Sequence, residues 1–527
     1  MGWQALGDSA WLYRVGDDGA DVRLHHALAL AARLREVAIP GVTDVVNGYD
    51  TVAVFADPAI AEEVGEAVRE VTADLSPSEL PEGRLVEIPV RYGGADLEEV
   101  ARRLGLGVDE VITRHSAAGF TVATVGFAPG FPYLAGLPQD LRLPRKETPL
   151  MVEAGSVAIA AGQAGIYPIA SPAGWWVLGK TAVPMFDAAA PEPGLLRPGD
   201  RVRFVAVDEL ARPPRAEAPS PEGPIEVLDP GAMTTIQDEG RPGFRRWGVA
   251  PGGAADPVAM AVANAMAGNA AGAAVLEVCM MGPRLRFHQA ARAAWCGWSG
   301  GARSADFAAG EELDLRAGLG SVRGYLAIAG GLDVEPCLGS RSTDLRGGFG
   351  GRVVMAGDRL RAGRSAGGPA PGAWRVGWPP CLPPASVIEV RVMRGVQASW
   401  FGPAELAGFF ARGFQISPRA DRMGMRLDGP RVTPPEREMV SQPVVPGSVQ
   451  VPPDGVPIVL LPEGQTLGGY PQIAHVIAAD LPQLGRLWPG TTLHFREVGP
   501  AEALQAWLDL RAELARLRTG LDLLKRG

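Results

Sequence analysis

The chain has 527 residues, too many for one hydrophobic core, so we expect about three to five domains. Hydrophobic residues make up 46% and charged residues 21%, as in globular proteins, and the 69 glycines and 48 prolines predict many turns and short strands. A net charge of −9 with no dominant basic patch argues against nucleic acid as a partner, and without a long apolar run or an apolar leader we expect neither a membrane span nor a secretory signal.

Residues 1–82 predict a small α+β subdomain. Residues 25–37 and 59–75 carry apolar side chains at helical spacing, and the valine-rich residues 45–57 between them predict strands.

The stretch from residue 126 to residue 181 is dense in glycine and proline, which separate apolar runs too short for helices. This pattern is typical of a small closed β-barrel, placed at residues 83–210, with short helices predicted at 96–106 and 108–115. The loops of such a barrel would line an aromatic-walled pocket; the alternative is that the aromatic side chains form the barrel core. The site candidates here are Tyr133, Arg145, Gln163, Tyr167 and Trp175.

Residues 174–181, GWWVLGKT, match the phosphate-loop pattern G-x-x-x-x-G-K-[ST]. The middle residues are bulky, and Pro184 follows where that fold requires a helix, so a strand end is favoured over a nucleotide cradle. Lys180 could still contact an anion from a barrel rim, and it is the candidate for cosubstrate binding.

A proline-bearing charged stretch at 211–223 predicts a linker between two halves. The halves end alike: AGSVAI is followed by PGDRVRFVAV in the first, and PGSVQV by PGTTLHFREV in the second. The spacing from Gly155 to Gly199 nearly equals that from Gly447 to Gly490, which predicts two copies of one barrel module. Shorter echoes of the closing phrase occur at 282–287 and 356–362. The predicted C-terminal parts are a first subdomain (224–365), a second barrel (385–499) and an amphipathic helix (500–527) that packs on the protein or mediates self-association.

Polar clusters in the C-terminal half indicate a site for a polar substrate. They supply Gln237, Asp238 and Arg241 from TTIQDEGRPG, the donors Ser340, Arg341 and Thr343 from GSRSTD, Arg422 and Arg426 from DRMGMRL, and Gln465, Thr466 and Tyr470 from EGQTLGGYP. Taken singly, each cluster is more often a structural turn or a solvated face. His115, at a predicted helix end, is a candidate general base or a helix C-terminal cation. The four cysteines are far apart with no C-x-x-C pair, so we expect neither zinc nor a disulfide framework, and a reducing cytoplasm.

These motifs carry a resemblance. Residues 85–207, with EIPVRYGGADLEEVA, GFAPGFPYLAGLP, AGSVAIAAGQAGIYPIASPAGW and PGDRVRF, resemble the KipI family, also called the 5-oxoprolinase B subunit or allophanate hydrolase subunit 1. Residues 225–498, with PGAMTTIQDEGRPG, AIAGGLDV, LGSRSTD, DRMGMRLDGP and PEGQTLGGYPQIAHVIAADL, resemble the KipA family, the 5-oxoprolinase C subunit or allophanate hydrolase subunit 2. Both families resemble the carboxyltransferase domain of urea carboxylase and imply cyclophilin-like β-barrels. The chain is therefore interpreted as a natural fusion of the B and C subunits, mainly β with α+β parts.

The resemblance implies ATP-dependent opening of 5-oxo-L-proline to L-glutamate, with ATP as cosubstrate, magnesium with it, and as partner a separate 5-oxoprolinase A subunit, of the LamB/YcsF family. The catalytic candidates are His115, Asp238 and Arg341. Donors such as Arg341, Ser340 and Thr343 would stabilise developing charge. The chain departs from the family pattern at Ala173, at Lys180 and in two segments, GGAAD (252–256), which keeps Asp256, and CGWSGGARS (296–304). The resemblance therefore does not fix the shape of the substrate pocket.

Two alternatives are kept. One is a carboxyltransferase acting on urea or a related amide with a separate biotin system. Neither Lys146, Lys180 nor Lys525 lies in an A-M-K-M-like turn, so we expect no biotin on this chain. The other, suggested by the KipI name, is a regulatory module that inhibits a sensor histidine kinase.

Overall fold

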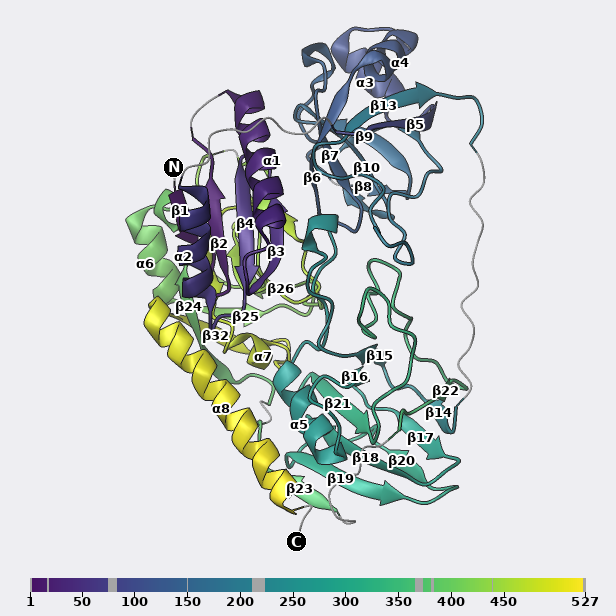
Figure 1. The fold of residues 1–527 in the computed structure, drawn as a ribbon, viewed down its shortest axis with the longest axis vertical. Coiled ribbons are helices and arrows are strands. Elements are labelled where there is room, and N and C mark those ends of the chain that lie inside the picture. Colours follow the sequence, from purple (N-terminus) through teal and green to yellow (C-terminus); the bar gives the residue numbers. More distant parts are fainter. Residues whose placement is uncertain are drawn as a thin grey trace.

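The computed structural model describes residues 2–16, 19–73, 83–148, 150–210, 223–364, 373–380, 383–437 and 439–524. Except for Gly223, the predicted linker lies outside these residues. Four parts follow one another along the chain (Figure 1).

The predicted N-terminal α+β subdomain is present. Its antiparallel sheet has the order β1 (Gly2–Ala5), β2 (Ala10–Arg14), β4 (Thr51–Ala56), β3 (Val42–Asn47), and its helices are α1 (Ala20–Val37) and α2 (Ala61–Thr72). Helix α1 packs on the sheet through Ala27, Leu30, Ala31 and Leu34, which lie on one face because they repeat at helical spacing.

Barrel 1 is closed by seven strands in the order β10-β7-β6-β13-β5-β12-β9. In chain order these are β5 (Leu85–Tyr92), β6 (Phe120–Val125), β7 (Pro132–Ala135), β9 (Ser156–Ala160), β10 (Gln163–Ile166), β12 (Trp176–Lys180) and β13 (Arg201–Ala206). Helices α3 (Leu97–Leu104) and α4 (Val108–Ala117) follow β5, as predicted, and β8 (Leu150–Val152) pairs with β11 (Ser171–Ala173) outside the barrel.

Barrel 2 repeats this topology, with the strand order β29-β26-β25-β32-β24-β31-β28. Its strands are β24 (Val387–Arg394), β25 (Gly413–Ile416), β26 (Gly424–Asp428), β28 (Ser448–Gln450), β29 (Ile458–Leu460), β31 (Gln472–Val476) and β32 (Thr492–Glu497), with helix α6 (Pro403–Ala411) after β24 and α7 (Leu481–Leu484) before β32. In each barrel the first and last strands pair in parallel. The matching phrases of the two halves lie at equivalent strands, which confirms the predicted repeat.

Along the chain, a subdomain of two sheets lies between the two barrels. One sheet has the order β20 (Glu312–Asp314), β17 (Arg284–Phe287), β14 (Ile225–Asp229), β22 (Arg359–Leu360). The other has the order β15 (Met233–Gln237), β16 (Val275–Cys279), β21 (Arg323–Ile328), β18 (Ala291–Cys296), β19 (Ala302–Phe307), β23 (Trp374–Val376) and carries helix α5 (Pro257–Ala267), whose N-cap is Asp256. The two echo phrases therefore flank β14 in one sheet.

The predicted end of this subdomain at residue 365 is wrong. Strand β23, at 374–376, pairs with β19 and so belongs to the sheet. Three residues between proline- and glycine-rich segments carry too little periodicity to be recognised as a strand, and the pairing becomes visible only through the neighbouring strand.

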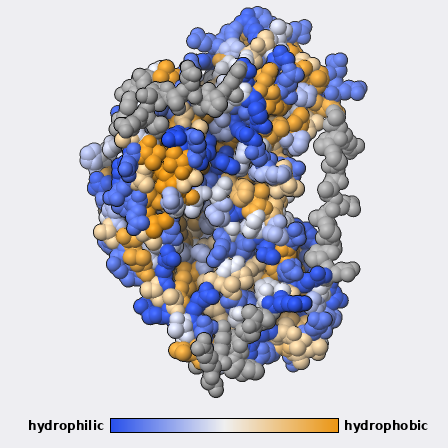
Figure 2. Space-filling model, viewed as in Figure 1, coloured by the Kyte–Doolittle hydropathy of each residue, from blue (hydrophilic) through white to orange (hydrophobic). Residues whose placement is uncertain are grey.

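Helix α8 (Pro500–Leu524) ties the parts together. Its first turns pack on barrel 2 through Ala503 and Ala506, and its end packs against α5 through Leu514, Leu517 and Leu521, so it crosses the molecule diagonally (Figure 1). A groove of about 260 Å³ lies between its start and the N-terminal subdomain, lined by Trp11, Met393 and Leu504 among others. Figure 2 shows hydrophobic residues gathered on the surface of the N-terminal subdomain. None of the helices in the described part of the chain is both long and apolar enough to cross a membrane.

A candidate site at the junction of the two halves

The aromatic cluster of barrel 1 lies on the outer face of its wall. Trp176 points inward to the barrel core with Ile159 and Leu178, whereas the preceding Trp175 packs outside with Tyr133 and Tyr167. The outer rings meet edge to face, with centroids 4.9 Å apart for Phe131–Tyr133, 5.0 Å for Phe131–Tyr167 and 6.0 Å for Tyr133–Trp175. The aromatic residues therefore form two buried sets, one in the barrel core and one packed on the outer face of the barrel wall. That the outer set lines a pocket stays a prediction.

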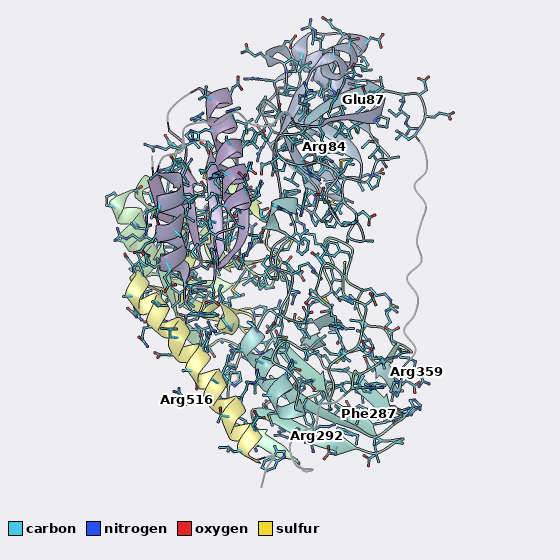
Figure 3. The ribbon with its side chains drawn as sticks, in the orientation of Figure 1. Arg84, Glu87, Phe287, Arg292, Arg359 and Arg516 are labelled. Carbon is cyan, nitrogen blue, oxygen red and sulfur yellow. The ribbon has the colours of Figure 1, made fainter. Side chains whose placement is uncertain are left out.

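Other parts of the chain cover this cluster. Leu6 and Leu12 from the N-terminal subdomain belong to it, as do Val445 and Leu467 from the C-terminal half. Leu467 lies in β30 (Leu467–Gly468), which pairs with β27 (Gln442–Pro443), and it packs where a side chain at Gly126 would stand. Figure 3 marks barrel 1 by Arg84 and Glu87, and the sheet subdomain by Phe287 and Arg359. The site is therefore built by both halves together.

The polar centre of this junction is the Tyr133 hydroxyl. Burial raises the pKa of Tyr133, while a hydrogen bond with Ser441 and the charges of Arg145 and Arg346 lower it. The buried hydroxyl of Tyr49, beside Tyr133, has no hydrogen-bond partner among the described residues. Groups from three segments far apart in sequence therefore converge on one hydroxyl.

Arg346 and Arg145 are the cations of the junction. The guanidinium of Arg346 lies 4.9 Å from the centroid of the Phe127 ring, and no hydrogen bond of its side chain is found within the described residues. Burial lowers the pKa of Arg346, and the nearby Asp344 and Tyr133 oppose this shift. Arg145 is exposed and lies near both Tyr133 and Tyr167. Two guanidinium groups beside flat aromatic walls suit a small carboxylate with a planar ring.

Glu463 is a buried carboxyl beside the junction. Its Oε1 accepts a hydrogen bond of 2.7 Å from Nε of Arg422. Burial raises the pKa of Glu463, Arg422 lowers it and Asp344 raises it further, so the net shift is upward. Glu463 also acts electrostatically on Arg346, so it belongs to the surroundings of the junction.

The predicted site residue Arg422 lies in a buried ion network. Its guanidinium contacts Glu277, Glu463 and the carbonyl oxygen of Gly253, and the Tyr325 hydroxyl donates to Glu277 at 2.8 Å. This network joins barrel 2 to the sheet subdomain. The geometry therefore favours the structural role of Arg422 over anion binding.

Asp238 organises the loop that carries the predicted donors. Its carboxylate accepts hydrogen bonds of 2.6 Å from Ser340 Oγ, from Ser342 Oγ and from the backbone N–H of Arg341. Arg341 Nε donates to the carbonyl oxygen of Val334 at 2.9 Å. Next to Asp238 in the chain, Gln237 supports the same loop, because its Nε2 donates to the carbonyl oxygen of Thr343 at 3.2 Å. Asp238 thus holds a turn in place.

The remaining predicted site residues are dispersed. Lys180 ends strand β12 and pairs with Glu153 at 2.5 Å on the surface, so the motif GWWVLGKT contains a strand end, as expected. Gln163 starts β10 on the face of Gly165, against which Phe131 and Trp175 pack. On the glycine-rich turn that also holds Leu467, Gln465 is half-buried and Tyr470 exposed.

The expectation for His115 requires correction. The imidazole is fully buried inside barrel 1, where Nδ1 lies 2.8 Å from the Tyr92 hydroxyl and the ring stacks 4.7 Å from that of Phe204. Burial lowers the pKa of His115 to about 3. It is therefore a neutral core residue, and neither a helix-end cation nor a base in contact with the junction.

Sequence reasoning missed Arg346, Glu463, Asp344, Ser441 and Tyr49. Asp344 is the last residue of the motif GSRSTD, and Arg346 follows two residues after it; Glu463 is the first residue of EGQTLGGYP. Their position in or beside these motifs was the sequence signal that could have identified them. Among the described residues, no group of three or more His, Cys, Asp or Glu side chains is arranged to hold a metal ion.

Comparisons with known proteins agree with this architecture. The protein-family model described as carboxyltransferase domain, subdomain C and D, matches residues 1–196. The family model described as carboxyltransferase domain, subdomain A and B, matches residues 247–497. A crystal structure of the protein TTHA0988 superposes with a TM-score of 0.81 at 38% identity, over 92% of this chain and 99% of that chain. The fold and the site thus define a carboxyltransferase-domain protein.

Relatives narrow the assignment. The chain is 39% identical over 210 residues to the 5-oxoprolinase B subunit of Escherichia coli O157:H7, covering 37% of this chain and 96% of the relative. It is 37% identical over 308 residues to the 5-oxoprolinase C subunit of Escherichia coli (strain K12), covering 54% of this chain and 94% of the relative. "Urea amidolyase" of Lachancea kluyveri is 30% identical over 312 residues, which is 17% of that relative. The chain belongs to the family of the 5-oxoprolinase B and C subunits, and it carries both in one polypeptide.

Proposed function

We propose that this chain is the fused B and C component of an ATP-dependent 5-oxoprolinase, which opens 5-oxo-L-proline to L-glutamate together with a separate A subunit. The proposal is supported by relatives of both names, each matched over nearly its whole length. The observation that carries it is the junction site, where the guanidinium of Arg346 from the C-like half lies 4.9 Å from the ring centroid of Phe127 from the B-like half and acts electrostatically on Tyr133. A site shared in this way would require the two parts to act as one unit.

The junction groups match the chemistry of 5-oxoproline. The substrate carboxylate would bind the guanidinium groups of Arg346 and Arg145, because charge-assisted hydrogen bonds to Arg are strong and directional. Its flat five-membered ring would pack against the edge-to-face cluster of Tyr133, Tyr167 and Trp175. Glu463 would move a proton at the lactam, since its raised pKa suits acid–base work.

The need for ATP follows from the bond to be broken. A lactam is a resonance-stabilised amide with a poor leaving group, so its carbon resists attack by water. Transfer of the γ-phosphoryl group of ATP to the lactam oxygen, with ADP leaving, makes that carbon electrophilic. Water then adds, the ring C–N bond breaks as nitrogen takes up a proton, and a second water releases phosphate from the resulting acyl phosphate. Donors at the junction would stabilise the charge that develops on oxygen.

Reconstitution tests this function. The purified chain, the A subunit, ATP with magnesium and 5-oxo-L-proline together are expected to form glutamate, measured by amino-acid analysis. The chain without the A subunit is expected to form little or none, because it covers only the B-like and C-like parts. Robust glutamate production by the chain alone would contradict this division, and no glutamate from the complete mixture would remove the assignment itself.

A second candidate function is carboxyl transfer to an amide with a separate biotin protein. It is favoured by the carboxyltransferase-domain match and by the similarity to urea amidolyase. Replacing 5-oxoproline and the A subunit with urea, bicarbonate and a biotin carboxylase system separates the two candidates.

Biotin is expected to be absent from this chain. Lys146 is paired with Asp96 at 2.6 Å and largely buried, and Lys180 is paired with Glu153, so neither lysine lies on a free hairpin that a biotin ligase could enter. Lys525 lies outside the described residues. Streptavidin blotting of the expressed protein is therefore expected to be blank, and avidin should not inhibit glutamate formation; a biotinylated lysine in the mass spectrum would favour carboxyl transfer instead.

A further inference from the structure

Arg241 is a buried cation with too few partners. Its side chain is 1% exposed, its Nη2 donates to the carbonyl oxygen of Ser342, and its guanidinium lies 5.1 Å from the centroid of the Phe349 ring. Nε and Nη1 have no acceptor, and among the described residues no carboxylate lies within ion-pair distance. Three of its five N–H groups therefore lack a partner, and burying such donors unpaired is costly. An acceptor from outside the chain would remove this cost.

A second unpartnered donor lies at the same turn. The Thr343 hydroxyl is buried, with the side chain 2% exposed, and it has no hydrogen-bond partner. A Cβ placed at Gly350 would lie 2.9 Å from Nη2 of Arg241, and one placed at Gly351 would lie 3.1 Å from Oγ1 of Thr343. These two successive glycines have φ of +72° and +118°. A turn without side chains therefore borders both donors.

The surroundings hold Arg241 in place. The loop that supplies the Ser342 carbonyl is fixed by the hydrogen bonds of Asp238 to Ser340 and Ser342. On the other side, a Cβ at Gly252 would lie 3.5 Å from Nη1 of Arg241. The open donors thus belong to a preorganised arrangement in which glycines leave room around the guanidinium.

Arg241 lies in the electrostatic neighbourhood of the junction site. Asp344 and Glu463 act on the pKa of Arg241 and also on that of Arg346. The two guanidinium groups therefore stand around the same pair of carboxyls. If Arg346 takes the carboxylate of a small substrate, Arg241 is placed to take a second anionic group of it.

We propose that Arg241 and Thr343 form a subsite for a phosphoryl group, adjoining the junction site. This inference rests on the proposed function, in which the activated lactam carries a carboxylate at one position and a phosphoryl group at another. A phosphoryl group offers three terminal oxygens, which can accept from the free N–H groups of Arg241 and from the Thr343 hydroxyl. Asp344, Asp238 and Glu463 oppose a dianion, and the upward pKa shift of Glu463 weakens its part of that opposition.

Binding of inorganic phosphate to the chain alone tests the subsite, by isothermal titration calorimetry and by the phosphate-induced rise of the melting temperature. The parent is expected to bind phosphate in the millimolar range or tighter. Arg241→Met should weaken binding about tenfold or more, and Thr343→Val about fivefold, as expected for lost charged and neutral hydrogen bonds. Thr343→Val keeps the side-chain shape and removes a hydroxyl without a partner, so its melting temperature should not fall. Arg394→Met, which removes an exposed arginine paired with Glu497, is the charge control and should bind like the parent.

Equal phosphate affinity in the parent, Arg241→Met and Thr343→Val would overturn the subsite and assign the free donors to internal water. The same holds if the parent binds no phosphate. If Arg241→Met does not fold, Thr343→Val alone decides. If both variants lose phosphate binding but the parent forms no glutamate in the reconstituted system, the subsite stands and the proposed function is removed. If the parent forms glutamate and the variants bind phosphate as the parent does, the proposed function stands and the subsite is overturned.

Discussion

Arg422→Met is expected to destabilise the protein by about 3–5 kcal/mol, because it leaves the buried carboxylates of Glu277 and Glu463 without their cation. Burial alone would raise the pKa of Glu277, but Arg422 and Arg323 outweigh burial and leave that pKa lowered, so Glu277 stays charged and needs its partner. The measurement is the melting temperature and the denaturant midpoint. Arg422→Lys, which keeps the charge and loses the fork of donors, should fall between Arg422→Met and the parent.

Arg426→Met is the matched control for this prediction. Arg426 stands four residues further along and pairs with Asp454 at 2.7 Å in a far more exposed setting. Removing it should change the free energy of unfolding by about 1 kcal/mol or less. An unchanged melting temperature in Arg422→Met, together with activity reduced tenfold or more, would show that Arg422 binds substrate and that its network is dispensable.

Arg346→Met is expected to lower kcat/KM for 5-oxoproline by about tenfold to a hundredfold in the reconstituted system. The reason is that a charged hydrogen bond contributes about 1.5–3 kcal/mol, and each ~1.4 kcal/mol is one decade in rate. Its melting temperature should stay near that of the parent, because no hydrogen bond of the Arg346 side chain to the described protein is lost. Tyr133→Phe, which removes a single hydroxyl, should have a smaller effect in the same direction.

Arg352→Met controls for loss of a cation in the same segment. Arg352 is half exposed, pairs with Asp358 at 2.8 Å and should leave kcat/KM unchanged. If Arg346→Met has the kinetics of the parent, Arg346 does not contribute to catalysis and the junction is not the active site. A melting temperature that falls in step with activity would instead make Arg346 a structural residue of the interface between the halves.

Sequence patterns predicted the modules well. Helical spacing located α1 and α2, and short runs between glycines and prolines located barrel 1. The repeated phrases located barrel 2 and identified β9 and β28 as equivalent strands. These features are local, since periodicity and turn residues act within a few positions of the chain. Strand β23 escaped because its three residues are held by a partner strand far away in sequence.

The candidate site was predicted only in part. Tyr133, Tyr167 and Trp175 were expected together and do pack together, because they belong to one barrel wall. Arg422 and Asp238 were attractive for their chemistry, yet their partners are a buried carboxylate pair and a serine-rich loop that no local pattern reveals. His115 does lie at a helix end, as predicted, but its side chain is buried against the aromatic rings of Tyr92, Phe120 and Phe204.

The sequence by itself determined the class of protein, the repeated barrel and the polar motifs, because each depends on residues close together in the chain. Only the tertiary structure decided which of those motifs meet. Tyr133, Ser441 and Arg346 converge because the B-like and C-like halves pack through Leu467 against Gly126. The folded chain also gives the two buried arginines different surroundings. Arg241 lacks acceptors for part of its guanidinium, whereas Arg422 is paired with Glu277 and Glu463, although both arginines lie in glycine-containing loops. Partner geometry and solvent access set the function of a charged side chain, and both are properties of the folded chain.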